Sequence, residues 1–88
     1  MPWYRLAFTP DVIADLAPLD KAFAQRLFDK TKWLASNVDN LRHEPMATDL
    51  PDVVKYAVGD WRILYTIDRG DHVVIVHAIL NRKDLAGC

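Results

Sequence analysis

The 88-residue sequence lacks the features that mark several classes of protein. Its single cysteine, Cys88, cannot form a disulfide within the chain, which fits a reducing cytoplasm. No apolar run approaches the roughly 18 residues that a membrane span needs. The apolar stretch at the N-terminus is interrupted by Arg5 and is too short for a signal peptide. No metal site or other cofactor is expected, because the histidines are scattered along the chain at His43, His72 and His77.

An excess of positive charge is also lacking. Eleven Lys and Arg residues stand against twelve Asp and Glu residues, which gives a net charge of −1. Residues 1–52 carry six positive against eight negative side chains, and residues 53–88 carry five against four. Proteins dedicated to nucleic-acid binding usually present a broad basic field. The composition therefore argues against strong non-specific binding to RNA or DNA.

The first half of the chain predicts one strand and two helices. About half of the residues are apolar (51%), which is enough for one core, and residues 1–88 are expected to form a single domain. Residues 3–8 predict a strand, and Thr9 followed by Pro10 predicts the start of a short helix that ends at Pro18. Asp20 is expected to cap a longer helix that reaches about Asn37 and forms a hairpin with the first. The apolar stripe of this second helix comprises Phe23, Leu27, Leu34 and Val38, with Thr31 in the gap.

The second half predicts three strands after a loop. Residues 39–52 contain two prolines and several charges, which is typical of a loop. Residues 53–58, 61–68 and 72–80 predict strands, joined by Gly59-Asp60 as a two-residue hairpin turn and by Arg69-Gly70 as the next turn. The last strand is apolar on both faces, which predicts a central strand covered on both sides. The expected fold is α+β, with a mostly antiparallel sheet.

The predicted hairpin places two cations on one surface. A two-residue loop sets Ala57 opposite Arg62 and Lys55 opposite Leu64, and side chains alternate between faces along a strand. These four residues are therefore expected to share one side of the sheet. A guanidinium on a rigid strand can hold a phosphate with two hydrogen bonds and stabilise developing negative charge. Arg62 and Lys55 are thus candidate phosphate-binding residues.

Two further candidate site residues, His77 and Arg82, belong to the last predicted strand and the segment after it. If Arg69-Gly70 closes a symmetric two-residue loop, Arg62 faces His77, and Arg82 follows just past the strand end. A loop of three residues would turn His77 to the other face. A histidine on this surface could act as a general base. The ordinary alternative is a buried, hydrogen-bonded histidine with a structural role.

Three segments together resemble one known family. The run VGDWRILYTID from Val58 to Asp68 is similar to the central motif of the RelE/ParE superfamily, the toxins of bacterial type II toxin–antitoxin systems. The closing segment Asn81-Arg82-Lys83-Asp84 and the linker His43-Glu44-Pro45, followed by Leu50, also resemble that family. The resemblance covers nearly the whole chain. It implies a microbial-RNase-like fold and a cognate antitoxin as partner in a hetero-oligomer.

The resemblance implies a first activity. RelE-type members cleave mRNA in the ribosomal A site, where basic side chains of the sheet and a C-terminal tyrosine handle the scissile phosphate. Arg62 matches the strand arginine of the family, Arg82 matches the arginine after the last strand, and Lys55 matches a basic position on the preceding strand. The first expectation is a cytoplasmic, metal-independent endoribonuclease that acts on translated mRNA. Lys55, Arg62, Arg82 and His77 would position the phosphate while the RNA 2′-hydroxyl attacks it.

Two alternatives stay open. ParE-type members share the fold but poison DNA gyrase and are not nucleases. Ala57 at the second basic position, the absence of a tyrosine from residues 85–88, and the low positive charge favour this reading. The third possibility is a protein that has lost its toxic activity and only binds its antitoxin. Apolar surface on the last strand and at Trp33 is a candidate for covering by that partner.

Overall fold

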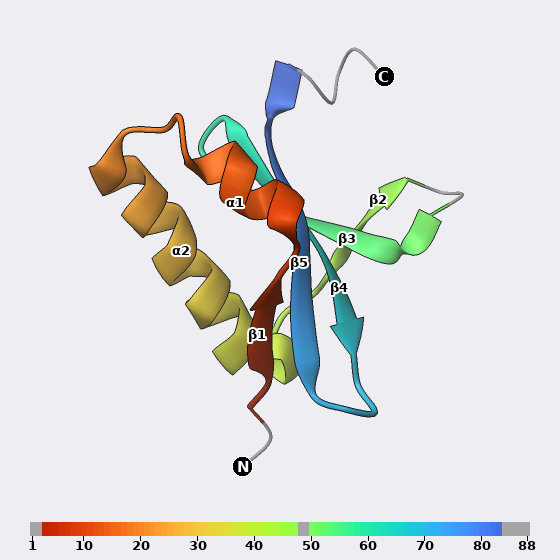
Figure 1. Cartoon of the computed structure of the whole chain (residues 1–88). Coiled ribbons are helices and arrows are strands. Elements are labelled where there is room, and N and C mark those ends of the chain that lie inside the picture. Colours follow the sequence, from red (N-terminus) through yellow and green to blue (C-terminus); the bar gives the residue numbers. More distant parts are fainter. Residues whose placement is uncertain (1–2, 48–49, 84–88) are drawn as a thin grey trace.

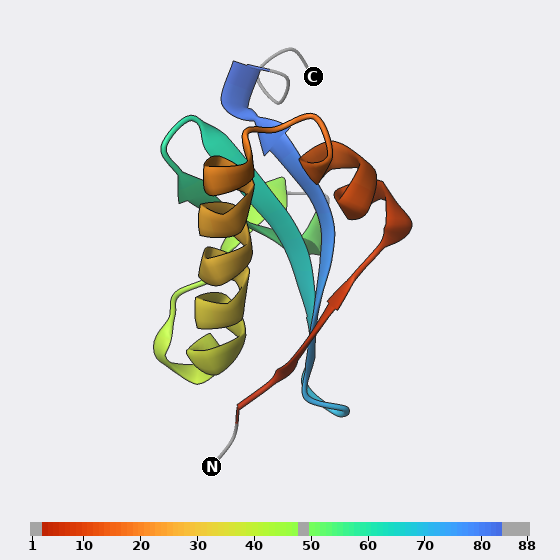
Figure 2. The ribbon, with the colours of Figure 1, turned by 60° about the vertical axis from the view of Figure 1, so that its left-hand side comes forward.

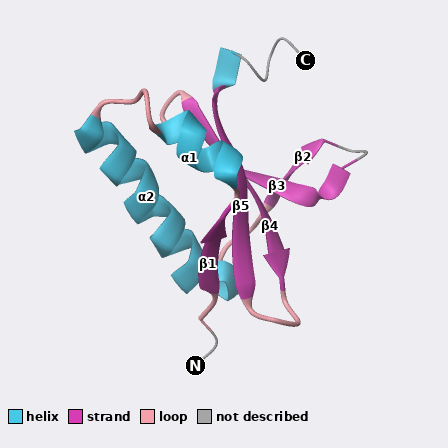
Figure 3. Ribbon diagram, viewed as in Figure 1, coloured by secondary structure: helices cyan, strands magenta, loops and turns pink. Residues whose placement is uncertain are grey.

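The computed structural model describes residues 3–47 and 50–83 of the chain. A five-stranded sheet with the strand order β1-β5-β4-β3-β2 carries two helices (Figures 1 and 3). This architecture confirms the predicted α+β class, with an N-terminal strand, two consecutive helices and a closing meander. The elements in chain order are β1 (Arg5–Phe8), α1 (Pro10–Leu16), α2 (Lys21–Ser36), a short 3-10 helix (Val38–Asn40), β2 (Glu44–Ala47), β3 (Leu50–Val58), β4 (Trp61–Asp68) and β5 (Val73–Asn81).

The sheet is antiparallel except at one edge, where β1 pairs in parallel with β5. The three predicted strands of the meander are confirmed to within three residues at each end. The loop predicted at 39–52 is wrong in part, because β2 and the first residues of β3 pair there, with Glu44 opposite Lys55 and Pro45 opposite Val54. β2 is an edge strand and pairs only with β3. Proline is tolerated there, because a backbone N–H that points away from the sheet has no ladder hydrogen bond to lose.

The first helix continues from β1 and lies along β5. Thr9 precedes Pro10 at the start of α1, as predicted, but its hydroxyl donates to the carbonyl of His77 (3.2 Å) and not to its own helix. Later in α1, a carboxylate oxygen of Asp15 accepts the backbone N–H of Ile79 (3.3 Å). The helix therefore covers the edge of β5 beyond the point where β1 ends (Figure 2).

The second helix follows its predicted capping pattern. Oδ2 of Asp20 accepts hydrogen bonds from the backbone N–H groups of Ala22 (3.2 Å) and Phe23 (3.3 Å), which satisfies two donors of the first turn. The middle of the predicted stripe is confirmed, because Leu27 and Thr31 are fully buried in the packed interior.

No helix within the described residues is long and apolar enough to cross a membrane.

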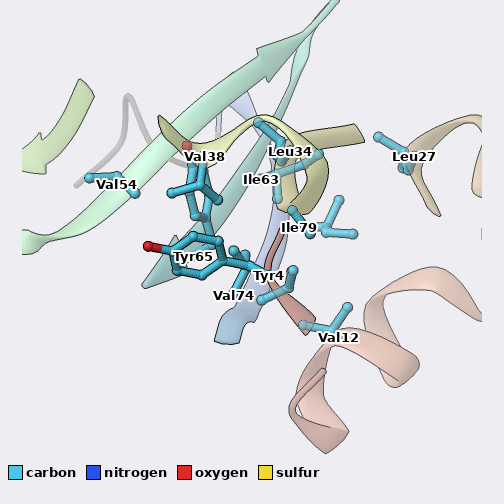
Figure 4. Close-up of a cluster of buried hydrophobic side chains, with 12 residues drawn as sticks. Tyr4, Val12, Leu27, Leu34, Val38, Val54, Ile63, Tyr65, Val74 and Ile79 are labelled. Atoms are coloured by element: carbon cyan, nitrogen blue, oxygen red, sulfur yellow. The ribbon is translucent and has the colours of Figure 1, made fainter. Parts of the chain in front are cut away.

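The core lies between the helices and one face of the sheet (Figure 4). Side chains from every layer meet there, including Val12 of α1, Leu27 and Leu34 of α2, and Ile63, Tyr65, Val74 and Ile79 of the sheet. β5 is central, as predicted, because it pairs with both β1 and β4. Its second face is only half-covered, and His77 is exposed there. The expectation of full cover on both sides was wrong.

The connection between β4 and β5 differs from the predicted turn. Asp68 pairs with Val73, so residues 69–72 form a four-residue connection, in which His72 has a φ of 56°. The register then shifts between Leu64 and Tyr65, which leaves His77 as the extra residue of a β-bulge. Arg62 consequently faces Leu80. The predicted pairing of Arg62 with His77 is wrong.

Candidate functional site

The side of the sheet that faces away from α2, called the open face below, carries the predicted site. Ile63 points into the core, so its neighbours Arg62 and Leu64 point to the open face. The register of β3 places Lys55 opposite Leu64 and Ala57 opposite Arg62. The structure therefore confirms that these two cations share a face of the sheet.

Both predicted arginines reach the turn between β3 and β4. Nη1 of Arg62 donates to the carbonyl oxygens of Gly59 (3.0 Å) and Trp61 (2.9 Å). The backbone N–H of Arg82 donates to the carbonyl of Asp60 (2.7 Å), and Nε of Arg82 lies 3.6 Å from Oδ1 of the same residue. The turn thus brings together Arg62 of β4 and Arg82, which follows the end of β5. Sequence reasoning did not anticipate that Asp60 would hold one of them.

Lys55 has a carboxylate neighbour of its own. Its Nζ lies 3.7 Å from Oε1 of Glu44, and the lysine side chain is 31% exposed against 73% for the glutamate. Glu44 belongs to β2, in the segment that the sequence predicted to be a loop. The missed strand is therefore the reason that this ion pair was missed.

His77 lies on the open face, as expected, but not opposite Arg62. Its Nε2 is 2.8 Å from the hydroxyl of Thr66 on β4, which fixes the ring against the sheet. Because Arg62 faces Leu80, His77 is displaced from Arg62 by roughly 10 Å along β5. The structure does not bring His77 into one compact cluster with Arg62 and Arg82.

Carboxylates moderate the charge of this surface. Glu44 and Asp60 each lie within 4 Å of a predicted phosphate-binding cation. Exposed ion pairs of this kind contribute little to stability, but each carboxylate lowers the positive potential that an approaching phosphate would meet. The open face offers guanidinium and ammonium groups without a strongly positive field.

A polar contact that the sequence did not predict joins His43, in the linker before β2, to Tyr65 in the core. Nδ1 of His43 lies 2.6 Å from the hydroxyl of Tyr65, and Nε2 lies 2.8 Å from the carbonyl oxygen of Val38. Burial, with a smaller contribution from Tyr56, raises the pKa of Tyr65 to about 12. His43 stood out in the sequence only as part of the linker motif, and no spacing rule pairs it with Tyr65.

A hollow of about 310 Å³ lies beside this contact, with His43, Asp52, Thr66 and Arg69 among its lining residues. It is polar and lies at the C-terminal end of β4, whereas the turn that gathers the arginines lies at the N-terminal end. Among residues 3–47 and 50–83, no three His, Cys, Asp or Glu side chains are placed to hold a metal ion.

Comparisons with known proteins identify the family and support the fold. Residues 6–86 match the model of a family described as the ParE toxin of the type II toxin–antitoxin system, parDE. The chain belongs to this toxin family. The match covers every helix and nearly all of the sheet, so the predicted RelE/ParE membership is confirmed. No curated protein is similar enough to count as a match.

Solved structures of RelE toxins share the fold of this family member. The toxin–antitoxin complex RelBE2 from Mycobacterium tuberculosis has a TM-score of 0.81 and 22% identity, covering 93% of this chain and 94% of that one. A mutant of the E. coli toxin RelE in the free state has a TM-score of 0.75 and 16% identity, covering 97% and 92%. The archaeal RelE–RelB complex from Pyrococcus horikoshii has a TM-score of 0.69 and 21% identity, covering 93% and 97%. At these identities the likeness extends to the fold alone.

Proposed function

We propose that this chain is the toxin of a type II toxin–antitoxin pair and that it acts in the manner of ParE-type toxins, by binding DNA gyrase without cutting RNA. The family match over residues 6–86 supports the toxin. Several structural neighbours are complexes of a toxin with its antitoxin, which supports a cognate antitoxin as the partner of this chain.

The moderated positive charge of the open face is the observation that favours a protein target over RNA. Metal-free cleavage of RNA needs cations that stabilise charge on the phosphate. Here Lys55 is next to Glu44, Arg82 is next to Asp60, and Arg62 donates to two backbone carbonyls. Ala57, opposite Arg62, adds no charge. A surface of mixed charge and half-buried apolar residues is suited to contact with a protein.

Expression of the chain without a partner in a bacterial host tests this proposal. We expect growth arrest, induction of a DNA-damage reporter and intact reporter mRNA by primer extension. Purified chain should inhibit supercoiling by purified gyrase. New cleavage ends in translated mRNA, lost with Arg62→Ala, would overturn the gyrase target. Normal growth would overturn toxicity itself and leave a protein that only binds its antitoxin.

The second candidate function is a metal-independent endoribonuclease. One observation favours it: the turn between β3 and β4 gathers Arg62 and Arg82 on the sheet that also carries Lys55. These cations would hold the phosphate while the 2′-hydroxyl attacks and the 5′-oxygen leaves. His77 lies roughly 10 Å from Arg62 along β5, so it is not placed to accept the proton of a 2′-hydroxyl next to a phosphate held by the two arginines. The primer-extension arm of the same experiment separates the two functions.

A further inference from the structure

Positive charge is concentrated on α2. Residues 21–36 carry four Lys or Arg side chains against one Asp, whereas the rest of the chain carries seven against eleven. An acidic protein therefore presents one basic helix. Helix α2 packs on the face of the sheet opposite to the open face, so this charge is separate from the arginines at the β3–β4 turn.

One flank of α2 combines this charge with aromatic surface. Arg26, Lys30 and Trp33 follow at the spacing that places residues on one stripe of a helix. Nζ of Lys30 lies 4.6 Å from the ring centroid of Trp33 and 5.7 Å from that of Tyr56 on β3. The two rings are tilted against each other at 5.9 Å, and Trp33 is 41% exposed. Arg26, Lys30, Trp33 and Tyr56 are called the basic–aromatic stripe below.

The stripe has no internal counter-charge. Within the described part of the chain, neither Arg26 nor Lys30 forms an ion pair. Like charges four residues apart weaken an isolated helix slightly, so the repulsion between Arg26 and Lys30 does not stabilise the fold. The other flank differs, because Lys32 lies 3.9 Å from the carboxylate of Asp29.

We propose that the basic–aromatic stripe docks an acidic segment of the antitoxin. Carboxylates of that segment would pair with Arg26 and Lys30, and an apolar side chain would cover the exposed ring of Trp33. Charge complementarity favours an acidic protein segment over nucleic acid, because the rest of this chain is acidic and would repel a phosphate backbone. The inference rests on the proposed function for the existence of an antitoxin, and it adds the surface and the chemistry of its contact.

The test of the basic–aromatic stripe compares charge reversal at Lys30, within the stripe, with charge reversal at Lys32, on the other flank of α2. The probe is the purified protein encoded next to the gene for this chain, titrated calorimetrically at low and moderate salt. We expect Lys30→Glu and Trp33→Ala each to weaken binding roughly tenfold or more, and Lys30→Glu to reduce the salt dependence of the dissociation constant. The matched control is Lys32→Glu, which makes the same charge change on the same helix and should bind within about threefold of the unchanged chain. Thermal unfolding verifies that all variants fold.

Cell growth supplies the second readout. The Lys30→Glu chain should arrest growth when expressed alone and should escape neutralisation when the antitoxin is co-expressed. Equal binding by Lys30→Glu and the unchanged chain would overturn the surface while leaving the toxin proposal intact. Loss of toxicity with unaltered antitoxin binding would also overturn it, because the stripe would then serve the target. If the unchanged chain does not bind the neighbouring protein, both the partner and the surface are wrong.

Discussion

The hydroxyl of Tyr65 lies 2.6 Å from Nδ1 of His43, at the point where the linker before β2 meets the core. The other ring nitrogen of His43 lies 2.8 Å from the carbonyl oxygen of Val38, which can only accept a hydrogen bond. Nε2 therefore carries the proton, and Nδ1 of the neutral ring accepts the O–H of Tyr65. A tyrosine that is 1% exposed is thereby satisfied by a residue from outside the sheet.

The raised pKa of Tyr65 predicts a loss of stability in alkali. Burial favours the neutral phenol and raises its pKa from 10.0 to about 12 in the folded chain. The unfolded tyrosine ionises near pH 10, so the contribution of the buried phenol is complete below pH 10 and declines as the pH rises toward 12. The decline amounts to about 3 kcal/mol. Urea unfolding of the original chain and of Tyr65→Phe at several pH values measures it.

Comparison with Tyr65→Phe isolates this effect from other groups that titrate in alkali. The variant should be less stable than the original chain at pH 8, by about 1–3 kcal/mol, because Nδ1 of His43 loses its donor. The difference should shrink between pH 10 and 12. A difference in unfolding free energy that stays constant over this range would contradict the assignment.

A double-mutant cycle should show that His43 and Tyr65 act together. His43→Ala and Tyr65→Phe both remove the same hydrogen bond, so the second substitution should cost less in the background of the first. We expect a coupling free energy of about 1 kcal/mol from denaturant unfolding at pH 8. The pair Asp20→Ala and Tyr65→Phe is the control, because Asp20 caps the far end of α2 and should add its cost independently. Coupling equal to that of the control would show that the contact adds no stability.

The two hairpins explain why the sequence predicted part of the site and missed the rest. Gly59, with φ of 59°, and Asp60 leave little choice of turn, so the register of Lys55 and Arg62 followed from local chemistry. The pair Arg69-Gly70 also looked like a two-residue turn. The actual connection runs to His72, and its length is set by where β5 can pack its buried residues.

The bulge and the edge strand are features of tertiary packing. β5 pairs with β4 on one side and contacts the start of α1 on the other, where the hydroxyl of Thr9 donates to the carbonyl of His77. Both sets of contacts are made with His77 as the extra residue of the bulge. β2 was missed because Pro45 and neighbouring charges are typical of loops, and an edge strand tolerates both. The cap of α2 by Asp20 depends on neighbouring residues and was predictable. Glu44 and Asp60 came next to the site cations only through strand pairing and the packing of Arg82 on the β3–β4 turn.

The core predicts a graded response along α2. Leu27 and Leu34 are fully buried, so truncation of either to alanine should cost about 2–5 kcal/mol in unfolding free energy. Gln25 lies on the exposed side of the same helix, and Gln25→Ala should change stability by less than about 0.5 kcal/mol. Urea unfolding monitored by tryptophan fluorescence measures all three. Similar costs at buried and exposed positions would contradict the packing described.

The two carboxylates of the open face should suppress binding of RNA. Glu44→Gln with Asp60→Asn removes the negative charges next to Lys55 and Arg82 without changing side-chain shape. We expect the affinity for a short single-stranded RNA to rise about three- to tenfold at low salt and to return to its original value at high salt. Asp11→Asn with Asp39→Asn is the matched control, since it makes the same change of net charge away from the β3–β4 turn. An equal rise in both pairs would mean that net charge alone decides binding, and the local neutralisation that favours a protein target would lose its basis.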